Sequence, residues 1–255
     1  MRLIDTHCHL NLIENKEDII KSFKENNVNF VIEVGIDIEN SFKSLELADN
    51  HKNIYCAVGI HPNESKKLSN KDFDTINILA KNEKVVAIGE IGLDYYREYT
   101  TKNEQYYSFV NQFNLAKENK LPVILHIRDA YDDAFNLIVN EGVNEDLGVV
   151  HCFSSDWKTA KKFLDLGFYI GIDGPITFKN NYKLVEVVKN TPVEYILPET
   201  DSPFLTPVPF RGKKNNPIYT KYIITKIAEI KNINPEELSE IFIENAKKLF
   251  KRIKI

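Results

Sequence analysis

Short runs of β-branched and aromatic residues recur along the chain and alternate with longer amphipathic stretches. The apolar runs read RLIDTH, NFVIEVG, IYCAVGI, KVVAIGE, LPVILHI, LGVVHCF, GFYIGID and EYILPET. They are short and almost wholly apolar, which is typical of strands buried on both faces of a parallel sheet. The pattern therefore predicts eight strands.

The stretches between these strands carry apolar residues at helical spacing. They span residues 16–27, 40–50, 70–82, 102–119, 129–140, 157–166 and 179–190, and residues 217–230 and 235–250 follow the last strand. The final stretch has a clear start signal, because Asn234 suits a helix cap and Pro235 suits the first helical position. The chain thus alternates strand and helix throughout.

Eight strands that are each followed by a helix favour an α/β fold, a (β/α)8 TIM barrel with an extra C-terminal helix. The alternative is a doubly wound open sheet, which usually has fewer strands and a glycine-rich first turn when it binds nucleotides. The first turn here, DTHCHLNL, contains no glycine. Because no linker divides the sequence, we expect a single domain over residues 1–255.

Composition narrows the function classes. The net charge is −4, which argues against a protein held on nucleic acid by a broad basic surface. No apolar run approaches the roughly 18 residues of a membrane span, and no signal-peptide core opens the chain. The three cysteines are scattered without a CxxC pair, so we expect a reducing compartment, the cytoplasm.

Chemically active residues gather at the predicted carboxyl ends of the strands. Four of the six histidines and two acids lie there, namely His7, His9, Glu90, His126, His151 and Asp201. In a barrel these ends form one face, which is where barrel active sites are built. We therefore expect the six side chains to converge.

The first two histidines indicate a metal site. Alternation along a strand places His7 and His9 on one side and Cys8 on the other, so Cys8 is expected to pack rather than to bind. A single histidine at a strand end is more often structural, but four imidazoles and two carboxylates exceed one tetrahedral site. The set suits two divalent ions that share a bridging carboxylate, with Zn²⁺ or Mn²⁺ favoured over Mg²⁺.

The residues also resemble a known family. DTHCHL, VGIHP, AIGEIGLDYY, PVILHIRDA, HCFS, ETDSPFL, RGKKNNP and NAKKLF are similar to the motifs of TatD-family metal-dependent deoxyribonucleases of the amidohydrolase superfamily. The matches run in order through nearly the whole chain. Two positions depart from the family pattern, Ser155 in place of a glycine and Pro198 in place of another apolar residue, and neither removes a candidate ligand.

The resemblance implies a division of the ligands between the two ions. His7, His9 and Asp201 would hold one ion, His126 and His151 would hold the other, and Glu90 would bridge them. It further implies hydrolysis of DNA phosphodiester bonds, from a short or single-stranded end, by a hydroxide that bridges the two metals. Asp201 would orient that nucleophile and accept its proton.

Further residues are candidates for holding the substrate. Arg128 could grip a phosphate and His61 could touch the substrate, while the loops LDYYREYTTK and FRGKKNN offer Tyr95, Arg211, Lys213 and Lys214. Glu199 could orient a ligand histidine. For each of these residues, an ordinary structural or solvated role is an open alternative.

Two other functions stay open. A small-molecule hydrolase of ester, lactone or amide bonds from the same superfamily could use the same metal pair, since fold does not determine substrate. A non-catalytic binding protein on a barrel scaffold is the other, although a complete ligand set disfavours it. The sequence shows no membrane segment and no obligate protein partner.

Overall fold

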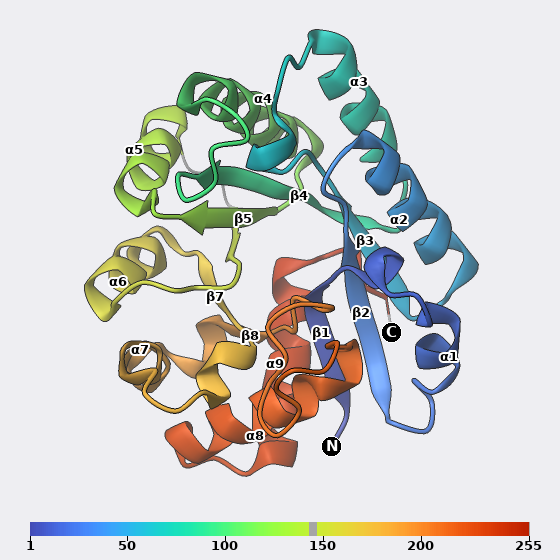
Figure 1. The fold of residues 1–255 in the computed structure, drawn as a ribbon, viewed down its shortest axis with the longest axis vertical. Coiled ribbons are helices and arrows are strands. Elements are labelled where there is room, and N and C mark those ends of the chain that lie inside the picture. Colours follow the sequence, from blue (N-terminus) through green and yellow to red (C-terminus); the bar gives the residue numbers. More distant parts are fainter. Residues whose placement is uncertain (143–146, 255) are drawn as a thin grey trace.

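The computed structural model describes residues 1–142 and 147–254, and it shows the predicted barrel. Eight parallel strands follow one another in chain order around the molecule, with the helices on the outside (Figure 1). The strands are β1 (Leu3–Cys8), β2 (Val28–Val34), β3 (Ile54–Val58), β4 (Val85–Asp94), β5 (Val123–Arg128), β6 (Gly148–Val150), β7 (Tyr169–Ile172) and β8 (Ile196–Pro198). All eight predicted strands are confirmed.

The helices also lie where the sequence places them. They are α1 (Lys16–Lys21), α2 (Ile38–Asn50), α3 (Asn70–Leu79), α4 (Lys102–Asn119), α5 (Tyr131–Glu141), α6 (Trp157–Leu166), α7 (Tyr182–Asn190), α8 (Thr220–Lys231) and α9 (Pro235–Leu249). Asn234 caps α9 as predicted, since its side chain accepts hydrogen bonds from Glu236 and Glu237. None of the helices described is both long and apolar enough to cross a membrane.

Several predicted helices begin later or end earlier than expected. α1 stops at Lys21, because the chain turns and Asn27, with φ of 54°, leads directly into β2. α7 begins at Tyr182 rather than at residue 179. Residues 217–219 form a 3-10 turn before α8. These are differences of one or two turns at helix ends, where local hydrogen bonds decide the boundary.

The barrel closes between its first and last strands. The N–H of Asp201 donates to the His7 carbonyl at 2.9 Å, and the N–H of His9 donates to the Ser202 carbonyl at 2.8 Å. Cys8 and Ser202 form a parallel bridge. Closure therefore uses the segment directly after β8, and it places Asp201 beside the two histidines of the first strand.

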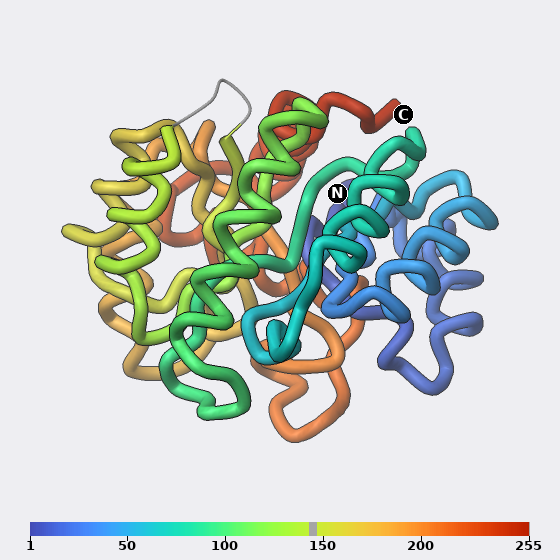
Figure 2. Tube along the Cα trace, turned by 90° about the horizontal axis from the view of Figure 1, so that it is seen from above, coloured from blue at the N-terminus to red at the C-terminus, as the bar shows by residue number. Residues whose placement is uncertain are grey.

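The two ends of the barrel differ. Both termini lie at one end, whereas the long segment that follows β8, coloured orange, projects from the other (Figure 2). At the end that carries the termini, Arg252 donates to the carbonyls of Ala80, Asn82 and Val85. The opposite end carries the candidate site.

Candidate metal centre

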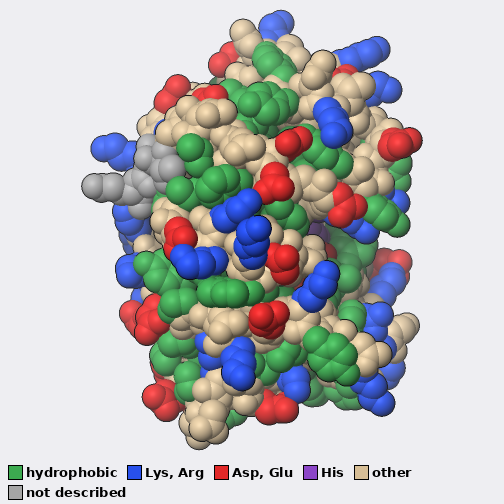
Figure 3. Space-filling view, turned by 90° about the vertical axis from the view of Figure 1, so that its left-hand side faces the viewer, with side chains coloured by type: hydrophobic (Ala, Val, Ile, Leu, Met, Phe, Trp, Pro, Cys, Tyr) green, Lys and Arg blue, Asp and Glu red, His purple; other side chains and the backbone are tan. Residues whose placement is uncertain are grey.

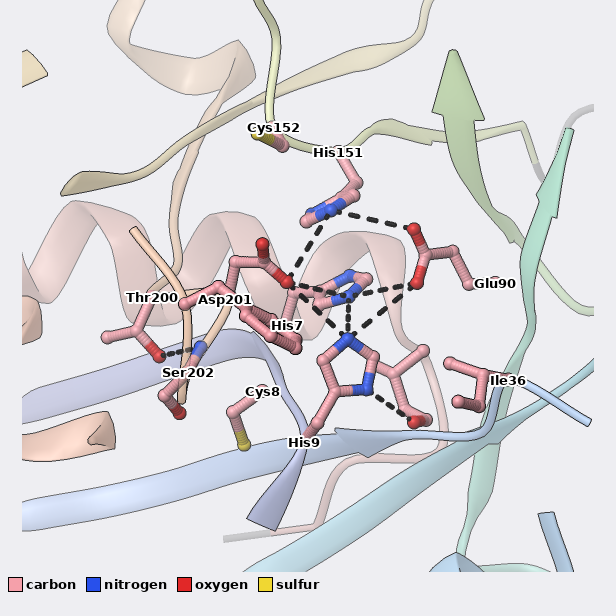
Figure 4. Close-up of polar contacts among 12 residues, drawn as sticks. His7, Cys8, His9, Ile36, Glu90, His151, Cys152, Thr200, Asp201 and Ser202 are labelled. Carbon is pink, nitrogen blue, oxygen red and sulfur yellow. Dashed lines mark hydrogen bonds and ion pairs between the residues drawn. The ribbon is translucent and has the colours of Figure 1, made fainter. Parts of the chain in front are cut away.

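The six predicted ligands come together at the carboxyl end of the barrel. His7, His9, Glu90, His151 and Asp201 point toward one another from four separate strands or the loops after them (Figure 4). His126 reaches the same centre through Glu90. The side chains of His7, His9, Glu90 and His151 are buried, so their polar atoms need partners within the protein.

Strand alternation also holds at Cys8. Its side chain points away from the histidines, and its thiol donates to the Ile32 carbonyl at 3.3 Å. Cys8 is fully buried and belongs to the core between the barrel and its helices. It therefore packs, as expected, and does not contribute to the group of ligands.

Glu90 stands between two pairs of imidazoles. Its Oε2 lies 3.4 Å from His7 Nε2 and 3.7 Å from His9 Nε2. Its Oε1 lies 2.7 Å from His126 Nδ1 and 3.6 Å from His151 Nε2. Each carboxylate oxygen thus faces a different pair of nitrogens, which is the arrangement of a bridging ligand. β4 does not end at Glu90 but continues to Asp94.

Three of the histidines are oriented by an acceptor on the far side of the ring. His9 Nδ1 lies 2.9 Å from the Val34 carbonyl, and His151 Nδ1 lies 2.7 Å from Glu199 Oε1. His126 Nε2 lies 3.2 Å from Asp94 Oδ2. Because these oxygens accept from the facing ring nitrogens, each ring is held with its other nitrogen directed into the centre.

This donor set fits divalent metal ions. His7 Nε2 and His9 Nε2 lie only 3.2 Å apart, and His126 Nδ1 faces a Glu90 oxygen at 2.7 Å. Lone pairs that face one another or a carboxylate repel unless a proton or a cation lies between them. Three groups of possible ligands share the centre among the described residues: His7 with His9 and Asp201, His7 with Glu90 and His151, and His61 with Glu90 and His126.

The charges in the centre shift the pKa values in opposite directions. Burial opposes charge on every group, yet the Asp201 carboxylate raises the pKa of His9 to about 9, and Glu199 with Glu90 raises that of His151 to about 10. Burial would raise the pKa of Glu90, but His7 and the other imidazoles hold it well below its usual range. The centre therefore favours carboxylates with positive charge between them.

His61 differs from the other histidines near the centre. Its Nδ1 accepts the N–H of Asn63 at 3.0 Å, so the proton of the neutral ring lies on Nε2, which is 3.8 Å from Glu90 Oε1. Burial, with His126 nearby, lowers the pKa of His61 to about 3 and keeps the ring neutral. Although it lies within reach of Glu90 and His126, His61 presents a donor and no lone pair to the centre.

Buried acids hold the loops that carry the ligands. Asp5 Oδ1 accepts the N–H groups of His7 and Thr200, and its Oδ2 accepts the Thr200 hydroxyl, which ties β1 to the segment before Asp201. Glu33 of β2 accepts the N–H of Leu10 at 2.5 Å and so fixes the turn after His9. Each acid thus joins a ligand-bearing segment to a part of the chain that is distant in sequence.

Glu199 is held in place by the backbone around it. Besides His151, its Oε1 accepts the N–H of Cys152 at 2.6 Å. Gly171 lies beneath the carboxylate, and a Cβ at that position would come within 2.7 Å of both oxygens. The absence of a side chain at residue 171 is therefore what gives Glu199 room beside His151.

A cavity of about 640 Å³ opens above the ligands. Among the residues that line it are Glu90, His126 and Asp201, together with Arg128 and Phe204 from the rim. Figure 3 shows a recess near the right-hand edge of the surface, with a histidine side chain inside it and hydrophobic and basic side chains around it. The volume suits a ligand of a few hundred daltons or the end of a polymer.

The candidate substrate contacts divide into two groups. His61 and Arg128 line the cavity. Tyr95, Arg211, Lys213 and Lys214 are not among its lining residues: the Tyr95 hydroxyl donates to Asp133, Arg211 stacks on Phe178 at 4.0 Å, Lys213 lies 5.5 Å from the Phe210 ring, and Lys214 pairs with Glu14. The substrate-binding role of these four residues stays a prediction, and the structure does not place them on the cavity wall beside the ligands.

Two kinds of site residue escape sequence reasoning. The first is Asp94, the partner of His126. Asp94 lies four residues after Glu90 on the same strand and so faces the same side, a pattern that the sequence could have revealed. Leu12 and Phe204 are exposed apolar residues on the cavity wall. No pattern distinguishes such loop residues from ordinary surface positions, because their placement depends on the closed barrel.

Comparison with known proteins places the chain in one family. A family model described as TatD related DNase matches residues 4–251. YabD of Bacillus subtilis (strain 168), named an uncharacterized metal-dependent hydrolase, is 42% identical over 252 residues, which cover 98% of this chain and 99% of the relative.

Solved structures show the same architecture. The TatD homologue YjjV of Escherichia coli K12 superposes with a TM-score of 0.92 at 31% identity, and 98% of each chain is covered. A TatD family hydrolase from Entamoeba histolytica superposes with a TM-score of 0.87 at 24% identity, with 99% of each chain covered, and this second likeness bears on the fold alone.

Proposed function

This chain belongs to the TatD-related DNase family of metal-dependent hydrolases, and from that premise we propose that it hydrolyses phosphodiester bonds of DNA at short or single-stranded ends. The observation that carries the proposal is the position of Glu90, whose two oxygens face two different pairs of imidazoles. A carboxylate so placed suits two divalent ions, the arrangement typical of phosphodiester hydrolysis.

We propose that His7, His9 and Asp201 hold one ion and that His126 and His151 hold the other, with Glu90 shared. Zn²⁺, Mn²⁺ and Mg²⁺ are the candidate ions, and the nitrogen-rich donor set favours the first two. Bound there, divalent ions would lower the pKa of water and neutralise charge on a phosphate oxygen.

The protein's own groups would perform the remaining work. Asp201 lines the cavity beside His9, and nearby imidazoles keep the pKa of its carboxyl low, so it is ionised and able to orient water and accept a proton. His61 presents an N–H beside Glu90, and Arg128 presents a guanidinium at the rim. Both are donors suited to a phosphate.

The supporting contacts would keep the ligands oriented. Glu199 lies beside His151 Nδ1 and Asp94 beside His126 Nε2, so these carboxylates would fix the orientation of both rings. Three free cysteines fit a reducing compartment, so we also place the enzyme in the cytoplasm.

One observation favours a second candidate, a small-molecule ester or lactone hydrolase. The cavity wall includes Leu12, Phe204 and Leu205, which could contact an apolar acyl group as well as a nucleobase. The guanidiniums of Arg97 and Arg128 on the same cavity favour a phosphate substrate over a neutral ester.

A direct comparison of substrates tests the proposal. Purified protein supplied with Mn²⁺, Zn²⁺ or Mg²⁺ is given single-stranded oligonucleotides, and in parallel a panel of lactones and esters. We expect nucleotide release from oligonucleotide ends and little turnover of the panel. The proposal is wrong if the panel is turned over efficiently while DNA stays intact with every metal.

A further inference from the structure

The cavity above the ligands has two unlike walls. Arg97 and Arg128 lie at the ends of β4 and β5, whereas Leu12 and Phe204 lie on the loops after β1 and β8. Because the strands follow one another in order from β1 to β8 around a closed barrel, the β4–β5 edge lies opposite the β8–β1 edge. The cationic and apolar walls thus face each other across the ligands.

The apolar wall presents a ring to the cavity. Phe204 is 52% exposed, and its ring centroid lies 6.4 Å from that of His9. The segment that carries it is fixed, since the Phe204 N–H donates to the Asp201 carbonyl and its own carbonyl accepts from Asn215. Leu12, 42% exposed, lines the same cavity. Exposed apolar groups beside a charged centre suit a planar ligand group.

The cationic wall is ordered by aromatic rings. The Arg128 guanidinium lies 3.8 Å from the Tyr96 ring centroid, and Arg97 donates to the Tyr99 hydroxyl. Among the residues that the structure describes, neither arginine forms an ion pair with a carboxylate. Their charge therefore remains available to an anion, and stacking limits the freedom that binding would otherwise remove.

We propose that a DNA strand crosses the mouth of the barrel with a nucleobase on Phe204 and Leu12 and a neighbouring phosphate on Arg97 and Arg128. The phosphate to be cleaved would then lie between the two walls, above Glu90. This inference rests on the proposed function and deepens it by giving the substrate an orientation. Because the platform contacts a base through its face, it would accept any base.

Binding to two strands of equal charge tests the orientation. One is a short single-stranded oligonucleotide that contains 2-aminopurine, and the other has the same length but abasic nucleotides throughout. Affinity and KM are compared for the wild type, Phe204→Ala and Arg128→Ala. Stopped-flow fluorescence of the 2-aminopurine reports stacking before turnover. Phe42→Ala is the matched control, since Phe42 is 51% exposed on α2, away from the cavity.

We expect the two substitutions to affect binding of the two oligonucleotides differently. Phe204→Ala should weaken binding of the base-bearing strand about tenfold and leave the abasic strand unchanged, whereas Phe204→Trp should preserve binding and quenching. Arg128→Ala should weaken the binding of both oligonucleotides and reduce the slope of log Kd against log salt by about one. Phe42→Ala should behave as the wild type.

Other outcomes overturn the orientation. If Phe204→Ala binds both oligonucleotides as the wild type does, or binds both more weakly by the same factor, Phe204 is not a base platform. Cleavage of DNA by the wild type would still leave the proposed function intact. If Arg128→Ala changes neither the affinity nor the salt slope, the phosphate position is wrong. A wild-type protein that neither binds nor cleaves the base-bearing strand contradicts both proposals.

Discussion

At the scale of single residues, the centre is organised by pairs of groups rather than by isolated ligands. Glu90 connects two pairs of imidazoles, and His151 and His126 are each backed by a carboxylate. A backed imidazole has one ring orientation, so the nitrogen opposite its carboxylate faces the centre before any ion arrives. The substitutions that matter most are therefore those that remove a shared or backing carboxylate.

Replacing the shared Glu90 carboxylate should remove the group that would bridge the two metal ions. We expect Glu90→Gln to lower kcat on oligonucleotides at least a hundredfold, because the amide keeps the volume but cannot bridge two cations. Circular dichroism should show an unchanged fold. The exposed Glu46→Gln is the control. Wild-type kcat in Glu90→Gln would show that this carboxylate has no bridging role.

Replacing a backing carboxylate should weaken metal binding more than it alters the fold. Asp94→Asn removes the anionic partner of His126, and we expect Mn²⁺ affinity to fall 10- to 100-fold. Titration with Mn²⁺ followed by equilibrium dialysis measures the change. Asp133→Asn is the control, since Asp133 lies at the surface and accepts from Tyr95. Equal affinity in the two variants would mean that Asp94 does not orient His126.

The convergence of the candidate ligands could be predicted from sequence, while the positions of most candidate substrate contacts could not. His7 and His9 follow from the period of a strand, and Asp201 joins them because the last strand of a barrel meets the first. Lys213 and Lys214 are predicted from the aromatic and cationic composition of the loops, and composition does not fix where a loop's side chains point. The structure places them outside the cavity lining.

At the scale of elements, periodicity predicted which segments are helices, and local hydrogen bonds set their ends. α4 begins at the predicted residue because Thr101 and Glu104 form a capping box. α1 ends two turns early, where Asn27 adopts a left-handed conformation that leads into β2. Such an ending depends on how the next strand enters the sheet, which a helical pattern does not encode.

The C-terminal segment stabilises the end of the barrel that carries no ligands. Arg252→Ala removes three hydrogen bonds to the carbonyls of Ala80, Asn82 and Val85, and we expect unfolding free energy to fall by about 2 kcal/mol. Thermal denaturation should show a Tm lower by roughly 4–8 °C, with kcat unchanged.

Arg2→Ala is the control for Arg252→Ala, because it also removes one arginine charge but breaks no hydrogen bonds to backbone carbonyls. Arg2 pairs with Glu240 in an exposed ion pair, and such pairs contribute less than about 1 kcal/mol. Arg2→Ala should therefore change Tm less than Arg252→Ala does. A larger loss in Arg2→Ala, or a loss of activity in Arg252→Ala, would contradict the separation of the barrel into a stabilising end and an active end.

At the scale of the whole molecule, the barrel concentrates its chemistry at one end. Residues as distant in sequence as His7 and Asp201 meet because strand order closes the sheet on itself. The net charge of −4 describes the whole surface, whereas the cavity itself carries Arg97 and Arg128. Composition thus argues against a long nucleic-acid footprint, but it could not reveal that these two cationic side chains lie together on the cavity wall.

Removing metal should lower stability without unfolding the protein. An ion at a concentration of 100 times its Kd stabilises the native state by about 2.7 kcal/mol, and the hydrophobic core does not depend on the ligands. We expect EDTA to lower Tm by several degrees and to leave the circular dichroism spectrum unchanged at 25 °C. A Tm that is identical with EDTA and with added Mn²⁺ would count against a metal centre.

Anomalous diffraction from crystals loaded with Mn²⁺ tests the two-ion centre most directly. We expect two anomalous peaks on either side of the Glu90 carboxylate, one contacting His7, His9 and Asp201 and the other contacting His126 and His151. A single peak that leaves Glu90 without a metal, or no peak among these residues, would contradict the two-ion centre.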